Sequence, residues 1–390
     1  MDTGIDHEVG LQLEPFLATA AELLAMPSTD DRPDQLRRAV DFVIALVGPG
    51  FVVERFESNG KPSALLYPER HRDHAPDGAM ATRPRFPVIL NGHLDVVPAE
   101  PDQFRPRREG GRLYARGAQD MKVSALLEAL VFRDVAARLP YPVALQLVAD
   151  EETGGRDGTL YQLQQGVSGD FVVIGENSRL DIVTGTKGLA QARLLATGRD
   201  DHGAYPWLGD NALMKIVNTA ARLMAAYPTP TQEIRRTTVN LARVHTPNQA
   251  VNRIPGRAEA WLDIRFPAGD EDFSGRTYAE IARHLSSFCD PGIEVVVDDY
   301  SPPQYVDQDR PEVLALRKAA QNQGFRGDYL YKHGSSDGGF YSELGIAAVA
   351  FGVGGAGQHG PDEYLDIDTV VPYYLALQEF LEQLVLSADG

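Results

Sequence analysis

Apolar residues recur along the chain with two spacings, one typical of helices and one typical of short buried strands. In the first third, apolar positions at helical spacing predict helices at 11–26 and 33–47, and short apolar runs predict strands at 51–53, 64–67 and 87–91. The same patterns predict a helix from 121 to about 139 and strands at 143–148 and 171–174. Strands that alternate with helices favour an α/β fold with a mostly parallel sheet flanked by helices.

The middle of the chain has a different pattern, in which longer strands follow one another with fewer helices between them. Strands are expected at 187–197, 237–245 and 258–266, and helices at 211–226 and 278–288. The α/β pattern then resumes, with a helix at 311–323, a strand at 346–351 and a final helix at 369–386. We therefore expect one α/β domain formed by residues 1–186 and 299–390, interrupted by a smaller α+β domain at 187–298.

The composition disfavours several classes of partner. The chain of 390 residues has a formal net charge of −18, whereas nucleic acids and anionic membranes are bound by basic surfaces. The single cysteine, Cys289, excludes an internal disulfide. The N-terminal segment has no apolar signal region, and the apolar stretch from Phe42 to Val53 is too short to span a membrane. We expect a cytoplasmic protein without nucleic-acid or membrane partners.

Polar side chains follow several of the predicted strands. The segment ILNGHLDVVP places His93 and Asp95 just after the strand at 87–91, where a buried hydrogen-bonded pair is the simpler interpretation and a metal site the alternative. Asp120 precedes the helix at 121, where aspartate is also a favoured N-cap.

Three further segments shift the balance toward a metal site. The strand in VALQLVADEETGG ends in Asp150, Glu151 and Glu152, which need a cation or a raised pKa unless solvent surrounds them. The strand in FVVIGENS leads to Glu176, and the strand in AAVAFGVGGAGQHG leads to His359.

Because ligands collect at the carboxyl ends of parallel strands, we expect these side chains to converge. Two imidazoles and three carboxylates suit a pair of divalent ions, with zinc favoured by the imidazoles and one carboxylate bridging the ions. The proposed set is His93, Asp120, Glu152, Glu176 and His359. Asp95 would orient the ring of His93 through its other nitrogen. Glu151 remains as a general base for a water molecule activated by the ions.

The motifs GHLDVVP, GAQDMKVS, DEETGG, GENS and QHGPDEYL, in this order over nearly the whole chain, resemble those of the dinuclear zinc peptidases and deacylases. That family includes acetylornithine deacetylase, succinyl-diaminopimelate desuccinylase, aminoacylase and the glutamate carboxypeptidases. The resemblance implies two Zn²⁺ per subunit, with Co²⁺ or Mn²⁺ as possible substitutes. It implies His93 and Glu176 as ligands of one ion, Glu152 and His359 as ligands of the other, Asp120 as the bridge and Glu151 as the general base.

The resemblance also identifies the inserted domain as a dimerisation or lid domain of a homodimer. Its segment DDHGAYPWLGDNAL supplies His202, which in the family reaches the partner subunit's site and stabilises an oxyanion. Without the resemblance, His202 would be interpreted as a surface histidine. Asn252 and Arg265 match positions that bind the substrate carboxylate, although a structural ion pair would also satisfy Arg265.

We therefore expect a metal-dependent hydrolase that cleaves the amide bond of an N-acyl amino acid with a free carboxylate. The alternative is a carboxypeptidase or dipeptidase. The segment HGSSDGGF resembles the corresponding loop of the desuccinylases, which implies substrate contacts through Gly334, Ser335 and Ser336.

Two other classes of protein are disfavoured. Residues 352–357 match the dinucleotide motif GxGxxG, but Pro361 and the lack of a helical pattern after it argue against a dinucleotide site. These glycines more plausibly allow the backbone to pass close to the metals and the substrate. A non-catalytic binding protein would lack a ligand or the base, whereas the five proposed ligands and the base are all competent side chains.

Overall fold

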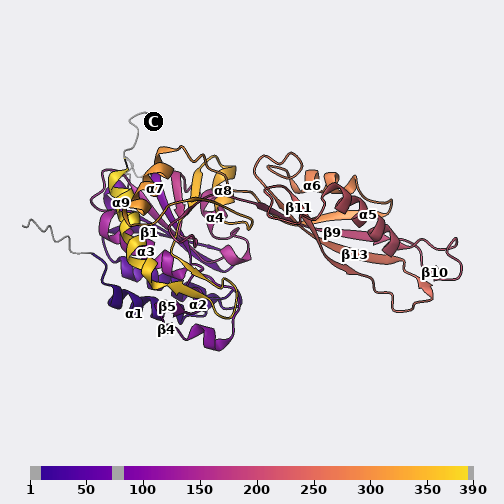
Figure 1. Cartoon of the computed structure of the whole chain (residues 1–390), viewed down its shortest axis with the longest axis horizontal. Coiled ribbons are helices and arrows are strands. Elements are labelled where there is room, and N and C mark those ends of the chain that lie inside the picture. The colour runs from indigo at the N-terminus through magenta and orange to yellow at the C-terminus, as the bar shows by residue number, and fades with distance from the viewer. Residues whose placement is uncertain (1–9, 73–82, 385–390) are drawn as a thin grey trace, which may run out of the picture. The chain divides into compact units, whose positions relative to one another are not determined.

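The computed structural model describes residues 10–72 and 83–384. The chain divides into two compact units, which are labelled by element in Figure 1. The first unit comprises Met1–Thr184, Val306–Leu330 and Leu344–Gly390, and the second comprises Gly185–Tyr305 and Tyr331–Glu343. The second unit is thus inserted into the first, and it also takes in residues 331–343, which the division from sequence places with 299–390.

An eight-stranded sheet forms the centre of the first unit. Its strands, in sheet order, are β1 (Phe51–Ser58), β2 (Lys61–Pro68), β6 (Val143–Val148), β3 (Phe86–His93), β7 (Gly169–Ile174), β16 (Ala347–Ala350), β8 (Ile182–Thr186) and β15 (Tyr329–Lys332). The four strands β6, β3, β7 and β16 pair in parallel, and antiparallel pairs flank them. The mostly parallel sheet confirms the predicted fold class, and the carboxyl ends of its four central strands lie at one edge.

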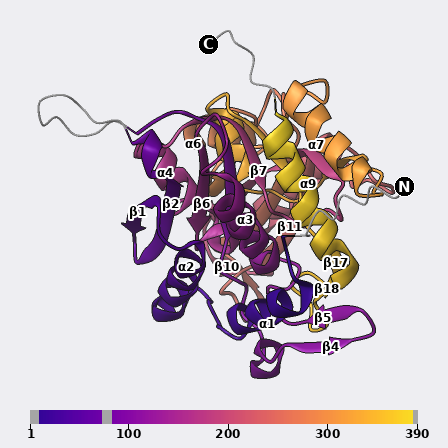
Figure 2. The ribbon, with the colours of Figure 1, turned by 90° about the vertical axis from the view of Figure 1, so that its left-hand side faces the viewer.

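Helix α3 (Lys122–Val135) is the central helix of this unit, because almost every residue in it is buried. It packs on β3 and β6 and has other helices beside it, as Figure 2 shows. The remaining helices of the unit are α1 (Leu13–Leu24), α2 (Pro33–Val47), α4 (Thr159–Gln164), α7 (Pro311–Asn322) and α9 (Val370–Gln383). Residues 385–386, which were expected to end the last helix, lie outside the described part of the chain. Within that part, no helix combines the length and the apolar character that crossing a membrane requires.

The inserted unit is built on a four-stranded antiparallel sheet. Its order is β11 (Thr238–His245), β13 (Arg257–Phe266), β9 (Gly188–Thr197) and β14 (Ile293–Ser301). Burial alternates along β9 and β13, so one face of the sheet is buried. The core on that face includes residues of α5 (Ala212–Ala226) and α6 (Tyr278–Ser286). The unit also contains α8 (Gly338–Glu343) and the short ribbon of β10 (Asp201–His202) and β12 (Arg253–Ile254).

A small sheet in the first unit joins two segments that are far apart in the sequence. Its order is β17 (Gly355–Ala356), β18 (Tyr364–Asp366), β5 (Arg112–Tyr114) and β4 (Arg107–Glu109). Leu365 of β18 pairs with Leu113 of β5. This pairing brings the loop before Asp120 beside the loop that contains His359.

Candidate metal centre

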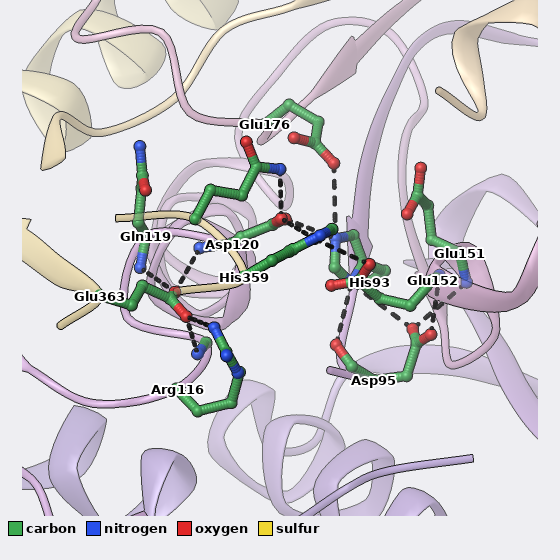
Figure 3. A network of polar contacts seen from close by, with 12 residues as sticks. His93, Asp95, Arg116, Gln119, Asp120, Glu151, Glu152, Glu176, His359 and Glu363 are labelled. Atoms are coloured by element: carbon green, nitrogen blue, oxygen red, sulfur yellow. Dashed lines mark hydrogen bonds and ion pairs between the residues drawn. The ribbon is translucent and has the colours of Figure 1, made fainter. Parts of the chain in front are cut away.

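The carboxyl ends of the central strands deliver the candidate ligands to one place, as Figure 3 shows. His93 is the last residue of β3, and Glu152 lies in a single 3-10 turn (Glu151–Thr153) that follows β6. Glu176 follows β7 by two residues. Asp120 precedes α3, and His359 lies between β17 and β18. The structure therefore brings together all five side chains that the sequence assigns to a metal site.

Asp120 lies between the two imidazoles. Its Oδ1 is 3.1 Å from Nε2 of His93, and its Oδ2 is 3.3 Å from Nε2 of His359. The side chain does not cap α3, so the N-cap interpretation is wrong for this residue. A carboxylate whose two oxygens face two different imidazoles has the orientation of a bridging ligand.

One glutamate accompanies each imidazole. Oε1 of Glu176 is 3.4 Å from Nε2 of His93, and Oε2 of Glu152 is 3.2 Å from Nε2 of His359. Potential ligand atoms of His93, Asp120 and Glu152 all lie within 4.8 Å of one another. The same holds for His93, Glu151 and Glu176, so the carboxylate of Glu151 faces the same space.

Asp95 contacts His93 but also holds the turn that follows β6. Nδ1 of His93 is 3.1 Å from the carbonyl oxygen of Asp95 and 3.4 Å from its carboxylate. That carboxylate accepts hydrogen bonds from the backbone N–H groups of Glu151 at 3.3 Å and of Glu152 at 3.0 Å. Asp95 thus orients one imidazole and fixes the backbone of two acidic residues.

Glu363 and Arg116, which the sequence analysis did not single out, lie on the far side of Asp120 from His93 (Figure 3). The buried carboxylate of Glu363 forms an ion pair with buried Arg116 and accepts hydrogen bonds from the backbone of the segment that ends at Asp120. Gln358 also donates a hydrogen bond to the Asp120 side chain. Gln358 and Glu363 both belong to the motif QHGPDEYL, which contains His359. Membership of that motif was the sequence signal that could have identified them.

A further buried acid lies behind the strand ends. Glu128 of α3 has no exposed surface, and its Oε1 accepts a hydrogen bond from the hydroxyl of Tyr373 at 3.3 Å. Glycines let α3 approach the strands here, because a Cβ on Gly92 would lie 2.6 Å from Cβ of Ala125 and one on Gly175 would lie 3.0 Å from Oε1 of Glu128. These glycines precede His93 and Glu176, so close packing of α3 sets where both candidate ligands emerge.

The electrostatics of the cluster favour positive charge between the carboxylates. Burial opposes protonation of His93, but Asp120, Asp95 and Glu176 outweigh it and raise its pKa well above the usual value. The contact with Asp120 raises the pKa of His359.

Two acids of the cluster also have shifted pKa values. Burial raises the pKa of Glu152 to about 7, with the charge of Asp120 adding to the effect. Burial opposes ionisation of Asp120, but the two imidazoles lower its pKa overall.

This donor set fits a pair of divalent cations. Carboxylate oxygens and imidazole nitrogens are the ligands that zinc takes in hydrolytic sites. The excess of buried carboxylates over cationic side chains would be neutralised by such ions. The candidate ligands are also held by outer contacts, at Asp95 and at Glu363, as is usual for metal ligands.

The GxGxxG segment has no role in a dinucleotide site here. No helix opens at the segment, which instead forms β17. A Cβ on Gly352 would lie 2.4 Å from the carbonyl oxygen of Gly175 and 2.6 Å from that of Glu176. The absence of a side chain therefore lets the chain after β16 pass directly against the backbone that carries a candidate ligand.

The remaining predicted site residues belong to the inserted unit. His202 and Asn252 are neighbours, since the N–H of Gly203 donates to the carbonyl oxygen of Asn252 at 2.6 Å and β10 pairs with β12. Both side chains are exposed.

Arg265 forms a bidentate ion pair with Asp263 through Nε and Nη2, which is the structural alternative raised from the sequence. Ser336 donates a hydrogen bond to Gln304 at 3.0 Å. Gly334 and Ser335 lie beside it in the loop after β15.

Residues 89–383 match the model of peptidase family M20/M25/M40, which is well over half of the chain. The chain belongs to this family. It is a metal-dependent hydrolase. Among curated relatives, succinyl-diaminopimelate desuccinylase from Verminephrobacter eiseniae is 28% identical over 411 residues, which cover 95% of this chain and 98% of the relative.

Solved structures of family members share the fold. An M20 family metallo-carboxypeptidase from Sulfolobus solfataricus is 19% identical, covers 94% of this chain and 98% of its own, and superposes with a TM-score of 0.73. A dinuclear metal-binding peptidase of the M20 family from Bacillus subtilis is 15% identical, covers 95% and 97%, and has a TM-score of 0.61. The recognition of a peptidase and deacylase family from the sequence motifs is therefore confirmed.

Proposed function

We propose that this M20 hydrolase is a deacylase that cleaves the amide bond of small N-acyl amino acids at a site for two divalent ions. The observation that carries the proposal is the position of Asp120, whose two oxygens face Nε2 of His93 and Nε2 of His359. The names of the curated relatives support a desuccinylase-like acyl group. A carboxypeptidase or dipeptidase is the alternative, which the peptidase name of the family supports.

In this proposal one ion is held by His93 and Glu176, the other by Glu152 and His359, and Asp120 belongs to both. Zinc is the proposed metal, with Co²⁺ or Mn²⁺ as substitutes, since imidazoles favour zinc over magnesium or calcium. When bound, the ions would supply Lewis acidity toward the amide carbonyl and lower the pKa of water at the site.

Glu151 is the proposed general base. Its carboxylate lies among the candidate ligands, within 4.8 Å of ligand atoms of His93 and Glu176. There it would accept a proton from the attacking water and pass it to the departing amine. The same position would also suit a metal ligand, so the two roles need separate readouts: a base leaves metal content unchanged when it is replaced, and a ligand does not.

Residues of the inserted unit would complete the site in a homodimer. His202 of the partner subunit would donate a hydrogen bond to the oxyanion that develops on the substrate. Asn252 and Arg265 would bind the substrate's free carboxylate. Because Arg265 uses Nε and one N–H of Nη2 for Asp263, its Nη1 and the second N–H of Nη2 are the donors that would meet the substrate. Gly334, Ser335 and Ser336 would contact the substrate through hydroxyl and amide groups.

The proposed substrate is a small anionic molecule, and the cytoplasm is the proposed compartment. The net charge of −18 makes a nucleic acid or an anionic membrane an unfavourable partner. A small anion would therefore be bound by local cations such as Arg265, against the charge of the whole chain.

The test combines elemental analysis with a substrate panel. The panel holds N-acetyl amino acids, N-succinyl-diaminopimelate, and dipeptides with free or blocked carboxyl ends, assayed with wild-type protein and Glu151→Gln. We expect about two metal ions per chain in both proteins, cleavage only of substrates with a free carboxylate, and a kcat about 10²–10⁴-fold lower in the variant. Cleavage of the free dipeptides alone would select the peptidase alternative. A wild-type protein that stays inactive with added zinc or cobalt would refute the proposal.

A further inference from the structure

The loop that carries His359 contains a second acidic residue, Glu363, that takes no part in the ligand set. Its side chain has no exposed surface, and that of its ion-pair partner Arg116 is 3% exposed. Figure 3 shows both on the side of Asp120 that faces away from His93. A fully buried ion pair is costly to form and often contributes little net stability. Stability alone therefore does not explain why this pair lies beside Asp120.

All the hydrogen bonds of the Glu363 carboxylate go to one short segment, residues 116–120. Oε2 accepts from the guanidinium of Arg116 and from the N–H of Gly117 at 3.1 Å. Oε1 accepts from the N–H of Gln119 at 2.9 Å and from the N–H of Asp120 at 3.1 Å. An ionised carboxylate only accepts hydrogen bonds, so it matches this group of four donors better than any other side chain of its size.

Two further hydrogen bonds join the same parts of the chain. Arg116 donates to the carbonyl oxygen of Gly360 at 3.2 Å, and the N–H of Ala115 donates to the carbonyl oxygen of Glu363 at 3.2 Å. His359 is the residue before Gly360, and its φ of 60° lies in the left-handed region that non-glycine residues seldom adopt. The backbone of this loop is thus held in an unfavourable conformation by its surroundings.

These contacts connect the carboxylate that faces both imidazoles to the loop of one of those imidazoles. The carboxylate of Glu363 accepts the hydrogen bond of the Asp120 N–H. In the sequence, Glu363 stands three residues after Gly360 and four after His359. Free rotation of the 116–120 segment would carry Asp120 away from one imidazole or the other. Asp120, which approaches His93 to 3.1 Å and His359 to 3.3 Å, therefore has its backbone N–H held by this anchor.

We propose that Glu363 is a positioning residue of the metal centre. Through the backbone of residues 116–120, it fixes the position of Asp120 relative to His359. This inference rests on the proposed role of Asp120 as a ligand shared by two ions. Glu363 makes no contact with substrate in this proposal. Replacing Glu363 would lower the affinity for metal, and most for the ion held by His359 and Glu152.

The test is the substitution Glu363→Gln in the full chain. Glutamine keeps the size of the side chain, but its NH₂ group must then face either Arg116 and Gly117 or the N–H groups of Gln119 and Asp120, which are all donors. Glu109→Gln is the matched control, since Glu109 makes the same kind of pair with an arginine, Arg107, while 72% exposed on the surface.

The readout is metal binding by folded, chelator-stripped protein, measured by titration with Zn²⁺ and by the absorption spectrum of bound Co²⁺. Thermal unfolding of the metal-free proteins is measured in parallel. We expect about a 10- to 100-fold weaker affinity in Glu363→Gln for at least one of two ions, with a changed Co²⁺ spectrum, and wild-type behaviour in Glu109→Gln. A variant that is less stable but binds both ions as the wild type does would overturn the proposal, because Glu363 would then be purely structural.

Two further measurements cover the remaining outcomes. If Glu363→Gln does not fold, Glu363→Asp keeps the charge but shortens the side chain, and a smaller loss of the same affinity is expected. Independently of any variant, amide exchange in metal-free wild-type protein should show protection at Gly117, Gln119 and Asp120; fast exchange there until metal is added would overturn the proposal. A wild-type protein that binds no metal would instead refute the proposed function, which keeps the two failures distinct.

Discussion

The carboxylate of Asp95 accepts a hydrogen bond from the backbone N–H of Glu152, at 3.0 Å. Its other oxygen accepts from the N–H of Glu151 at 3.3 Å and lies 3.4 Å from Nδ1 of His93. One carboxylate therefore positions an imidazole on β3 and the turn that presents both acidic residues after β6. The sequence predicted the first of these roles and not the second.

Replacing Asp95 by asparagine should disturb candidate ligands of both proposed ions at once. The amide NH₂ of asparagine would face N–H donors of the turn or the ring of His93, so at least one of these hydrogen bonds is lost. We expect a 10- to 100-fold loss in metal affinity or in kcat/KM, measured by metal titration and steady-state kinetics. Asp102→Asn, at an exposed position, is the control. Wild-type metal content and rate in Asp95→Asn would show that the turn is held by other contacts.

Gly92→Ala tests whether close packing of α3 sets the position of His93. The new methyl group would lie 2.6 Å from Cβ of Ala125 and 3.0 Å from its Cα, and the helix backbone cannot yield as a flexible side chain does. We expect a loss of about 1–3 kcal/mol in the free energy of unfolding. The measurement is urea unfolding of metal-free protein. Gly334→Ala is the control, because a Cβ there meets open space and should change stability by less than about 0.5 kcal/mol.

Glu128 should make stability depend on pH. Burial raises the pKa of its carboxyl well above the usual value, so the folded protein keeps a proton that the unfolded chain releases. The unfolded state then binds fewer protons, and this group lowers stability as pH rises from about 4.5 toward the raised pKa, by at most about 1.4 kcal/mol per pH unit.

Glu128→Gln removes that dependence while keeping the shape of the side chain. Relative to wild type, the metal-free variant should gain stability as the pH rises above about 5, as measured by urea unfolding across the range that the folded protein tolerates. The exposed Glu294→Gln serves as the control, with a curve parallel to that of wild type. Parallel curves for Glu128→Gln as well would mean that Glu128 is ionised in the folded protein.

The convergence of the candidate ligands could be predicted from sequence because the four central strands run in the same direction. His93, Glu152 and Glu176 each lie at or just after the end of one of three adjacent strands, so a strand-end argument needs only the strands and their direction. Asp120 and His359 reach the site through loops, and they were found because their motifs stand beside the others in the sequence.

The buried residues that hold the candidate ligands in place could not be predicted in the same way. Arg116 and Glu363 stand in polar segments, where charged residues are usually solvated, and only the pairing of β5 with β18 brings them together in the interior. The strand β8 was also missed, because a five-residue segment with glycine inside it has too weak a pattern. By contrast, the pair of Asp263 and Arg265 follows from their spacing, since alternate residues of a strand share a face.

The role proposed for His202 can be tested by mixing two inactive variants. His202→Ala should lower kcat by about 10²–10³-fold without changing metal content, and Glu151→Gln should also be inactive. If His202 acts in the partner subunit's site, a mixed dimer has one complete site, formed by the intact Glu151 of one chain and the intact His202 of the other. Equal amounts of the two chains, mixed by co-expression, should therefore recover about a quarter of the wild-type activity. Mixtures that stay inactive, although the subunits exchange, would place His202 in the site of its own chain or outside the reaction.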